Sequence, residues 1–173
     1  FRSLFIKIAS RIQQAVDTQQ ALKNTTKEIR NFLDTDRVAI FKFDTESSYS
    51  QGRVVVEDVR PGYVSAIEIQ VTDHCFGEGM AEEYRKGRVC AFTDIYEAGL
   101  ADCYIEILAQ FQVRADLVAP LLKGDELWGL FCIHQCSGPR QWQESEIEFA
   151  KRIAAQLNLA IQQGEYIEKL QQR

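Results

Sequence analysis

Hydrophobic residues follow a helical spacing at the start of the chain. Between Phe1 and Val16 they recur every three or four positions, which places one narrow apolar stripe on a helix. Thr18 is expected to cap a second helix. The buried positions of that helix are predicted to be Leu22, Ile29, Phe32 and Leu33.

The spacing then changes to the period of two that is typical of strands. Residues 37–43 alternate in this way, and residues 52–59 are rich in valine and stop at a Pro61-Gly62 turn. Residues 63–73 are expected to be extended but irregular. A helix over 78–86, ended by Gly87, and a short strand over 88–92 are predicted to follow.

The second half of the chain predicts a helix, a hairpin and a long final helix. Asp102 is expected to cap a helix that carries Cys103. Strands over 113–122 and 126–136 are joined by a short turn with a glycine, as in a hairpin. Apolar positions between Ile147 and Ile167 define the last helix. This order predicts an α+β domain with an antiparallel sheet.

Composition and charge narrow the class of protein. The 173 residues fit one domain, over 1–173, with a real core. Hydrophobic residues make up 46% and charged residues 26%, as in ordinary soluble globular proteins. The net charge of -5 argues against a nucleic-acid partner, and no apolar run is long enough to span a bilayer. Because the chain begins without methionine and ends in a polar helix, we expect a fragment of a longer protein.

The unusual chemistry gathers around two of the five cysteines. Five is an odd number, and the spacing shows no paired framework, so free thiols in a reducing, cytoplasmic compartment are expected. Cys75 stands in the run Asp73-His74-Cys75-Phe76, and Cys103 follows 28 positions later. A helix start favours a thiolate at Cys103, whereas the nearby acid makes Cys75 a poor general nucleophile. A small buried side chain is the alternative for Cys103.

Three segments in order resemble one family. Asp73-His74-Cys75-Phe76 looks like an Asp-X-Cys-Phe motif, Ile95-Tyr96-Glu97-Ala98-Gly99-Leu100 leads to Cys103, and Leu127-Trp128-Gly129-Leu130 leads to His134-Gln135-Cys136. With these, nearly the whole chain resembles the Asp-X-Cys-Phe subfamily of the cyanobacteriochromes, which are bilin-binding GAF domains related to phytochromes. The resemblance implies a GAF-like sheet with flanking N- and C-terminal helices and a bilin pocket on one face.

The resemblance also implies a photosensory function rather than an enzymatic one. Phycocyanobilin or phycoviolobilin would be joined permanently to Cys103 through a thioether. Cys75 would add reversibly to the methine carbon between rings B and C, which moves absorption to violet or blue. Light would isomerise the C/D-ring double bond and release this thiol, which moves absorption to green. Attachment and any isomerisation of the pigment would be autocatalytic.

The same resemblance gives roles to residues around the two cysteines. Asp73 would accept hydrogen bonds from the pyrrole nitrogens of a cationic pigment, although a turn or helix cap is the plain alternative. Phe76 belongs to the motif, and His74 is expected at a polar pocket edge. Tyr104 stands where relatives often have histidine, and it would stack on the pigment and offer a hydroxyl.

Three further residues are candidates for contact with the pigment. His134 would face the D ring, or else be a core histidine bonded to the backbone. Arg85 and Arg88 would pair with the propionates, and a solvated helix end is nearly as good an interpretation. No metal site is predicted, because His134 and its neighbouring cysteines on one strand face do not suit a tetrahedral ion.

Partners and rival functions remain open at this point. The terminal helices have seam-like spacing and are expected to pack together and to pair in a homodimer. The resemblance implies an output domain of the chemotaxis-signalling or diguanylate cyclase type, with membrane anchoring of the full-length protein left open. One rival is a non-covalent module for a small molecule such as a cyclic nucleotide. The other is a thiol redox sensor.

Overall fold

An antiparallel sheet forms the centre of the computed structural model, which describes residues 1–67 and 69–171, with side chains as far as residue 164 except at position 78. The sheet has six strands in the order β3-β2-β1-β6-β5-β4. The strands are β1 (Arg37–Phe43), β2 (Gln51–Val59), β3 (Gln70–Thr72), β4 (Cys90–Phe92), β5 (Ala115–Lys123) and β6 (Glu126–Gln135).

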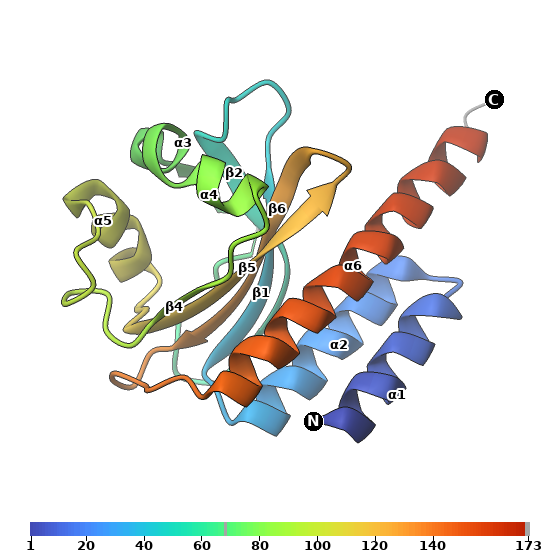
Figure 1. The fold of residues 1–173 in the computed structure, drawn as a ribbon, viewed down its shortest axis with the longest axis horizontal. Coiled ribbons are helices and arrows are strands. Elements are labelled where there is room, and N and C mark those ends of the chain that lie inside the picture. The colour runs from blue at the N-terminus through green and yellow to red at the C-terminus, as the bar shows by residue number, and fades with distance from the viewer. Residues whose placement is uncertain (68, 172–173) are drawn as a thin grey trace.

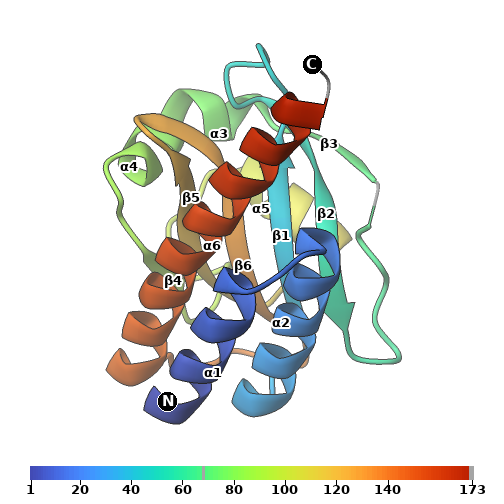
Figure 2. The same cartoon turned by 90° about the vertical axis from the view of Figure 1, so that its right-hand side faces the viewer.

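Helices cover both faces of this sheet. They are α1 (Arg2–Gln13), α2 (Thr18–Leu33), α3 (His74–Gly79), α4 (Ala81–Arg85), α5 (Asp102–Gln110) and α6 (Glu144–Gln171). The helices α1, α2 and α6 lie side by side on one face, and the short helices α3, α4 and α5 lie on the other (Figures 1 and 2). The predicted α+β architecture, with an antiparallel sheet and terminal helices, is confirmed.

Alternating residues of the strands divide the core between the two faces. Along β1, Val38 and Ile40 pack toward α1, α2 and α6, whereas Ala39 and Phe43 pack toward α3, α4 and α5. This division follows from the strand period of two, and it is the one that the sequence predicts. The second core contains two of the candidate site residues, Phe76 and Tyr104, so the site lies on the face of the short helices.

The terminal helices pack against each other, as expected. The rings of Phe1 and Phe149 have their centroids 5.3 Å apart, and the guanidinium of Arg152 lies 4.1 Å from the centroid of the Phe5 ring. The apolar stripe of α6 is buried from Ala150 to Ile161; the Ile167 side chain lies outside the described residues.

Three local predictions are wrong. Asp17, not Thr18, caps α2, because its carboxylate accepts the backbone N–H of Gln20. Phe32 is 48% exposed and lies against Phe1 at the edge of the helical layer, since the strand face is already filled by Ile29 and Leu33. Asp102 is the first residue of α5 and makes no capping bond, because Ala101 holds the N-cap position.

The helix predicted over 78–86 is present as two shorter helices. It begins earlier than predicted, at His74, and breaks at Met80 between α3 and α4. Asp73 causes the early start, because it is the N-cap of α3 and its side chain accepts the backbone N–H of Phe76. Within the described part of the chain, none of the helices has the length and apolar character needed to cross a bilayer.

Candidate functional site

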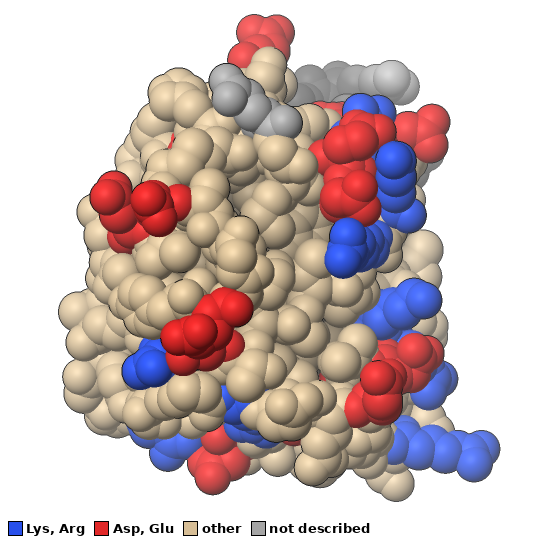
Figure 3. Space-filling view, turned by 60° about the vertical axis from the view of Figure 1, so that its left-hand side comes forward, with Lys and Arg blue, Asp and Glu red and all other residues tan. Residues whose placement is uncertain are grey.

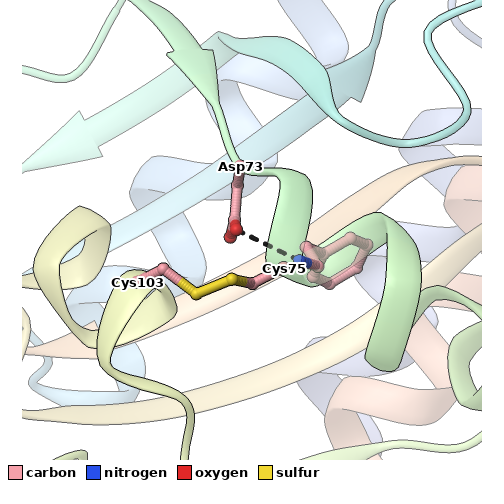
Figure 4. The surroundings of a disulfide bond; sticks show 4 residues. Asp73, Cys75 and Cys103 are labelled. Atoms are coloured by element: carbon pink, nitrogen blue, oxygen red, sulfur yellow. Dashed lines mark hydrogen bonds between the residues drawn. A yellow bond between two sulfur atoms is a disulfide. The ribbon is translucent and has the colours of Figure 1, made fainter.

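Asp73 positions the first cysteine. Its side chain is 8% exposed, and Oδ1 accepts a hydrogen bond of 3.1 Å from the backbone N–H of Phe76, which begins α3. Cys75 therefore lies in the first turn of this helix. The carboxylate of Asp73 points toward the space beside the two cysteine side chains (Figure 4). The helix-cap interpretation of Asp73 is thus confirmed.

The second cysteine comes from a different helix. Cys103 lies in the first turn of α5, as predicted, and forms a disulfide with Cys75. Their Cα atoms are 6.4 Å apart, within the range that a disulfide bridges. The expectation that all five cysteines are free is therefore wrong. The fold brings α3 and α5 together, and the spacing of the cysteines along the chain does not show that these two helices are neighbours. Cys90, Cys132 and Cys136 are free thiols.

The same three side chains form the candidate ligand group for a metal. The ligand atoms of Asp73, Cys75 and Cys103 all lie within 4.8 Å of one another. Two thiolates and a carboxylate suit a thiophilic cation, but in the disulfide neither sulfur is available as a thiolate. In this structure the two cysteines therefore form a disulfide and not part of a metal site.

A groove opens beside the cysteines. Its volume is about 300 Å³, and Cys75, Met80, Arg88, Phe92 and Leu100 are among its lining residues. This size is within the range of small-molecule sites. Met80 and Phe92 are not predicted as site residues, because apolar residues in short irregular segments carry no periodic signal; Leu100 is named only as the end of the motif that leads to Cys103.

A smaller cavity of about 90 Å³ lies deeper, between the short helices and the sheet. Phe76 and Tyr104 line both the groove and this cavity, so their rings separate the two. The ring centroids of this pair are 6.1 Å apart, and Phe76 also stacks on Phe43 at 5.3 Å. Burial raises the pKa of the Tyr104 hydroxyl well above its usual value, so this group stays protonated.

Polar side chains stand at the inner end of the cavity. His134 is 8% exposed and lines the cavity with Arg37 and Asp116, which are 0% and 1% exposed. The sequence motifs identify His134 but neither Arg37 nor Asp116. A charged residue inside an otherwise apolar strand is the signal that identifies both, since such residues are rarely buried without a role.

The remaining predicted residues lie at the surface. His74 is exposed on α3. Arg85 and Arg88 do not share a helix face, because α4 ends at Arg85. Arg88 reaches the groove and pairs with Glu83 at 3.3 Å, whereas Arg85 pairs with Glu82 and reaches the carbonyl of Asp125. On the face shown in Figure 3, the centre carries a few acidic groups, and most Lys and Arg side chains lie along the right-hand edge among further acidic groups.

Comparison with known proteins identifies the family of this chain. The family model of the GAF domain matches residues 17–161, and this chain belongs to that family. The predicted resemblance to cyanobacteriochrome GAF domains is confirmed by solved structures. The blue-light-absorbing form of the Thermosynechococcus elongatus PixJ GAF domain is 34% identical, with a TM-score of 0.75 over 97% of this chain and 92% of that one.

Two other proteins extend the comparison. The phycocyanobilin-bound GAF domain of a cyanobacterial phytochrome is 28% identical, with a TM-score of 0.81 over 94% of this chain and 93% of that one. A methyl-accepting chemotaxis protein of Synechocystis is 38% identical over 93% of this chain. The chain spans only 16% of the length of that relative.

Proposed function

We propose that this domain is a photosensory input domain that binds a linear tetrapyrrole covalently and switches reversibly between violet- or blue-absorbing and green-absorbing states. The observation that carries the proposal is the meeting of two cysteines, from α3 and α5, beside a groove on the face that carries the inner cavity. The similar phycocyanobilin-bound phytochrome domain supports the ligand class.

The residues present fit such a ligand. The sulfur of Cys75 lies at the groove, an aromatic pair lies behind it, and a buried carboxylate oxygen of Asp116 without a hydrogen-bond partner among the described residues lies at the inner end. We propose phycocyanobilin or phycoviolobilin as the ligand. When bound, it supplies the absorption of light and the isomerisation about its C/D-ring double bond. The protein supplies attachment, charge and shape.

The two cysteines take different roles in this proposal. The sulfur of Cys103 forms the permanent thioether, because the first turn of α5 favours its thiolate. The sulfur of Cys75 forms a carbon–sulfur bond in one photostate and leaves again as a thiolate in the other. Both sulfurs must first be released from the disulfide, since each forms only one of these bonds at a time.

Asp73 is suited to hold a cationic ligand beside Cys75. Its capping bond to Phe76 uses Oδ1 and fixes the carboxylate in place. This carboxylate would accept hydrogen bonds from the pyrrole N–H groups of the ligand. A positively charged ligand would also be more electrophilic toward the Cys75 thiol than a neutral one. One residue thus starts the helix and provides the countercharge.

The side chains of Phe76 and Tyr104 lie between the groove and the inner cavity. Because their rings line both spaces, a four-ring ligand extends past them only when they turn aside. The rings would then lie against the ligand faces, and His134 would meet its far end. Arg88 is the cation at the groove that suits a propionate; Arg85 and His74 have weaker positions for contact.

An absorption spectrum before and after violet light tests the proposal. Protein produced together with a bilin synthesis pathway is expected to be coloured, to lose its violet or blue band on illumination and to gain a green band. Green light is expected to reverse the change. A colourless protein, or one whose spectrum does not respond to light, would contradict the proposal.

The disulfide favours one second candidate, a thiol redox sensor. In that case the reversible reaction is the two-electron reduction of the Cys75–Cys103 disulfide to two thiols by a cellular dithiol. The domain would then be colourless, and thiol reduction would change its properties without light. The signalling partner of either sensor is proposed to be an output domain of the chemotaxis type, as in the Synechocystis relative.

A further inference from the structure

Asp116 is a buried carboxylate that the proposed attachment chemistry does not use. It lies on β5 directly opposite His134 on β6 and is 1% exposed. Its Oδ1 atom lies 3.4 Å from His134 Nε2, within ion-pair distance, but the alignment does not make a hydrogen bond. Within the described part of the chain, Oδ1 therefore has no hydrogen-bond partner, although it lines the inner cavity.

The neighbouring arginine fixes the proton of His134. Arg37 Nη1 lies 3.2 Å from His134 Nδ1, and a guanidinium only donates hydrogen bonds. Nδ1 must then accept, which leaves the proton of the neutral ring on Nε2, the nitrogen nearest Asp116. The side chain of Arg37 is itself held by Glu57 at 3.1 Å and by the carbonyl oxygen of Phe111 at 2.8 Å.

The inner end of the cavity thus presents one donor next to one acceptor. Nε2–H of His134 donates, Oδ1 of Asp116 accepts, and apolar side chains such as Val118 and Leu130 line the adjacent wall. The complementary ligand edge has a carbonyl oxygen and an N–H on adjacent atoms, which is a cyclic amide, or lactam. The outermost ring of a linear tetrapyrrole is a lactam of this kind.

We propose that Asp116 completes, beside His134, a lactam clamp for the terminal D ring of the pigment; the contact of His134 with this ring is the one that the family resemblance already implies. His134 donates to the ring carbonyl, and Asp116 accepts the ring N–H. This rests on the proposed function, and it adds Asp116 as a residue that positions the ring whose orientation light changes. Arg37 acts through His134 and does not touch the ring.

The clamp also sets the direction of the ligand. A carboxylate at the inner end repels an anionic group in a space of low dielectric constant, so propionates must stay toward the groove and Arg88. The guanidinium of Arg37 lies at the same end, but it already donates to Glu57 and to the carbonyl oxygens of Phe111 and Val64, so a phosphate of a cyclic nucleotide is also disfavoured there. The charge pattern therefore favours a neutral lactam over the non-covalent nucleotide ligand.

The test uses ¹⁵N-labelled phycocyanobilin assembled with wild-type protein and with Asp116→Asn, Asp116→Leu and Asp58→Asn. The last is a matched control, because Asp58 pairs with Arg30 of α2 on the opposite face of the sheet. The D-ring N–H resonance is expected at a hydrogen-bonded position in wild type and control. It should move partway in Asp116→Asn, whose amide oxygen still accepts, and should lose the hydrogen-bonded shift in Asp116→Leu.

A second readout needs no pigment. In bilin-free protein, the ¹⁵N resonances of His134 are expected to show a protonated Nε2 and an unprotonated Nδ1; the reverse pattern would overturn the clamp. The third readout is the dissociation constant for phycocyanobilin. It is measured on proteins with and without Asp116→Leu that all carry Cys75→Ala and Cys103→Ala, so that the pigment binds reversibly. Loss of one hydrogen bond to a charged group predicts about 10- to 100-fold weaker binding for Asp116→Leu.

The failure of the clamp and the failure of the proposed function look different. If wild-type protein takes up no pigment, both fail. If pigment attaches and switches with light, but the D-ring N–H resonance is the same in wild type and Asp116→Leu, only the clamp fails. Asp116→Asn keeps the shape of the side chain, so a folding defect in Asp116→Leu does not remove the test.

Discussion

Cys75 and Cys103 are bonded to each other although 28 positions and two separate helices lie between them. Each sulfur has one bond to give. The disulfide therefore excludes both thioethers of the proposed function. After reduction, the two thiols would lie next to each other in the same small space. Asp73, whose carboxylate completes that space, is also the residue that begins α3.

The oxidised, bilin-free domain is expected to take up no pigment covalently. Incubation with phycocyanobilin after a dithiol reductant should give a pigment band that survives a denaturing gel, and incubation without it should not. The dithiol supplies two electrons and two protons to the disulfide, is itself oxidised to a disulfide, and returns both thiols of the domain. Equal labelling of the oxidised and reduced proteins would contradict the exclusion.

The two cysteines should separate cleanly by substitution. Cys103→Ala is expected to lose denaturation-resistant pigment, whereas Cys75→Ala should keep it and lose only the violet or blue state. Absorption spectra and denaturing gels of both variants measure this. Cys90→Ala is a suitable control, because this buried free thiol lies outside the disulfide. Full covalent colour in Cys103→Ala would show that the assignment is wrong.

Asp73 has a structural and a chemical role that two variants distinguish. Asp73→Ala removes the cap of α3 and should lower the free energy of unfolding by about 1 kcal/mol, whereas Asp73→Asn keeps a capping oxygen and should stay near wild type. Denaturant unfolding of the reduced, bilin-free protein measures this.

The pigment-loaded Asp73 variants give the second half of that test. Both lack the countercharge, so both should show an altered green-absorbing state, including Asp73→Asn with its intact cap. If Asp73→Asn matches wild type in every spectrum, Asp73 is a cap and nothing more.

The partly buried thiol of Cys136 should not compete for the pigment. Burial raises the pKa of Cys136 to about 11, and the nearby Arg37 only partly offsets this rise. At pH 8 roughly 0.1% of this thiol is then ionised, and alkylation by iodoacetamide should be slow and speed up toward pH 11. Peptide mass spectrometry after labelling checks it, with the reduced Cys103 as the reactive reference. Rapid labelling of Cys136 at neutral pH would contradict this prediction.

The sequence predicts the sheet and the long helices well, because they bury one face along many residues. The alternation in β1 and the stripe of α6 are examples, and both are found where expected. The short segments are different. A cap such as Asp17 or Asp73 depends on one backbone angle, and the sequence pattern offers several neighbouring residues that would serve equally.

The candidate site shows a similar limit. Motifs identify Cys75, Cys103 and His134, but only the fold shows that two of them are within bonding reach. Asp116 and Arg37 are charged residues in strands. The strand period of two assigns each of them to a face of the sheet, but it does not show that both line the inner end of one cavity. Their partners are far apart in sequence, so spacing carries no information about these contacts.

Gly129 is predicted to be the least tolerant glycine of the sheet. It pairs with Lys42 where β6 meets β1, and a Cβ added there would overlap the carbonyl oxygen of Phe41. Because that neighbour is backbone within a ladder of hydrogen bonds, the strands would have to separate, so Gly129→Ala should destabilise the domain by on the order of 3 kcal/mol. Gly138→Ala is the control, since a Cβ there meets no atom within 4 Å. Denaturant midpoints of the two reduced, bilin-free variants decide the matter: equal midpoints would mean that the β1–β6 spacing adapts to a side chain, and that this glycine is not required for the sheet that carries His134.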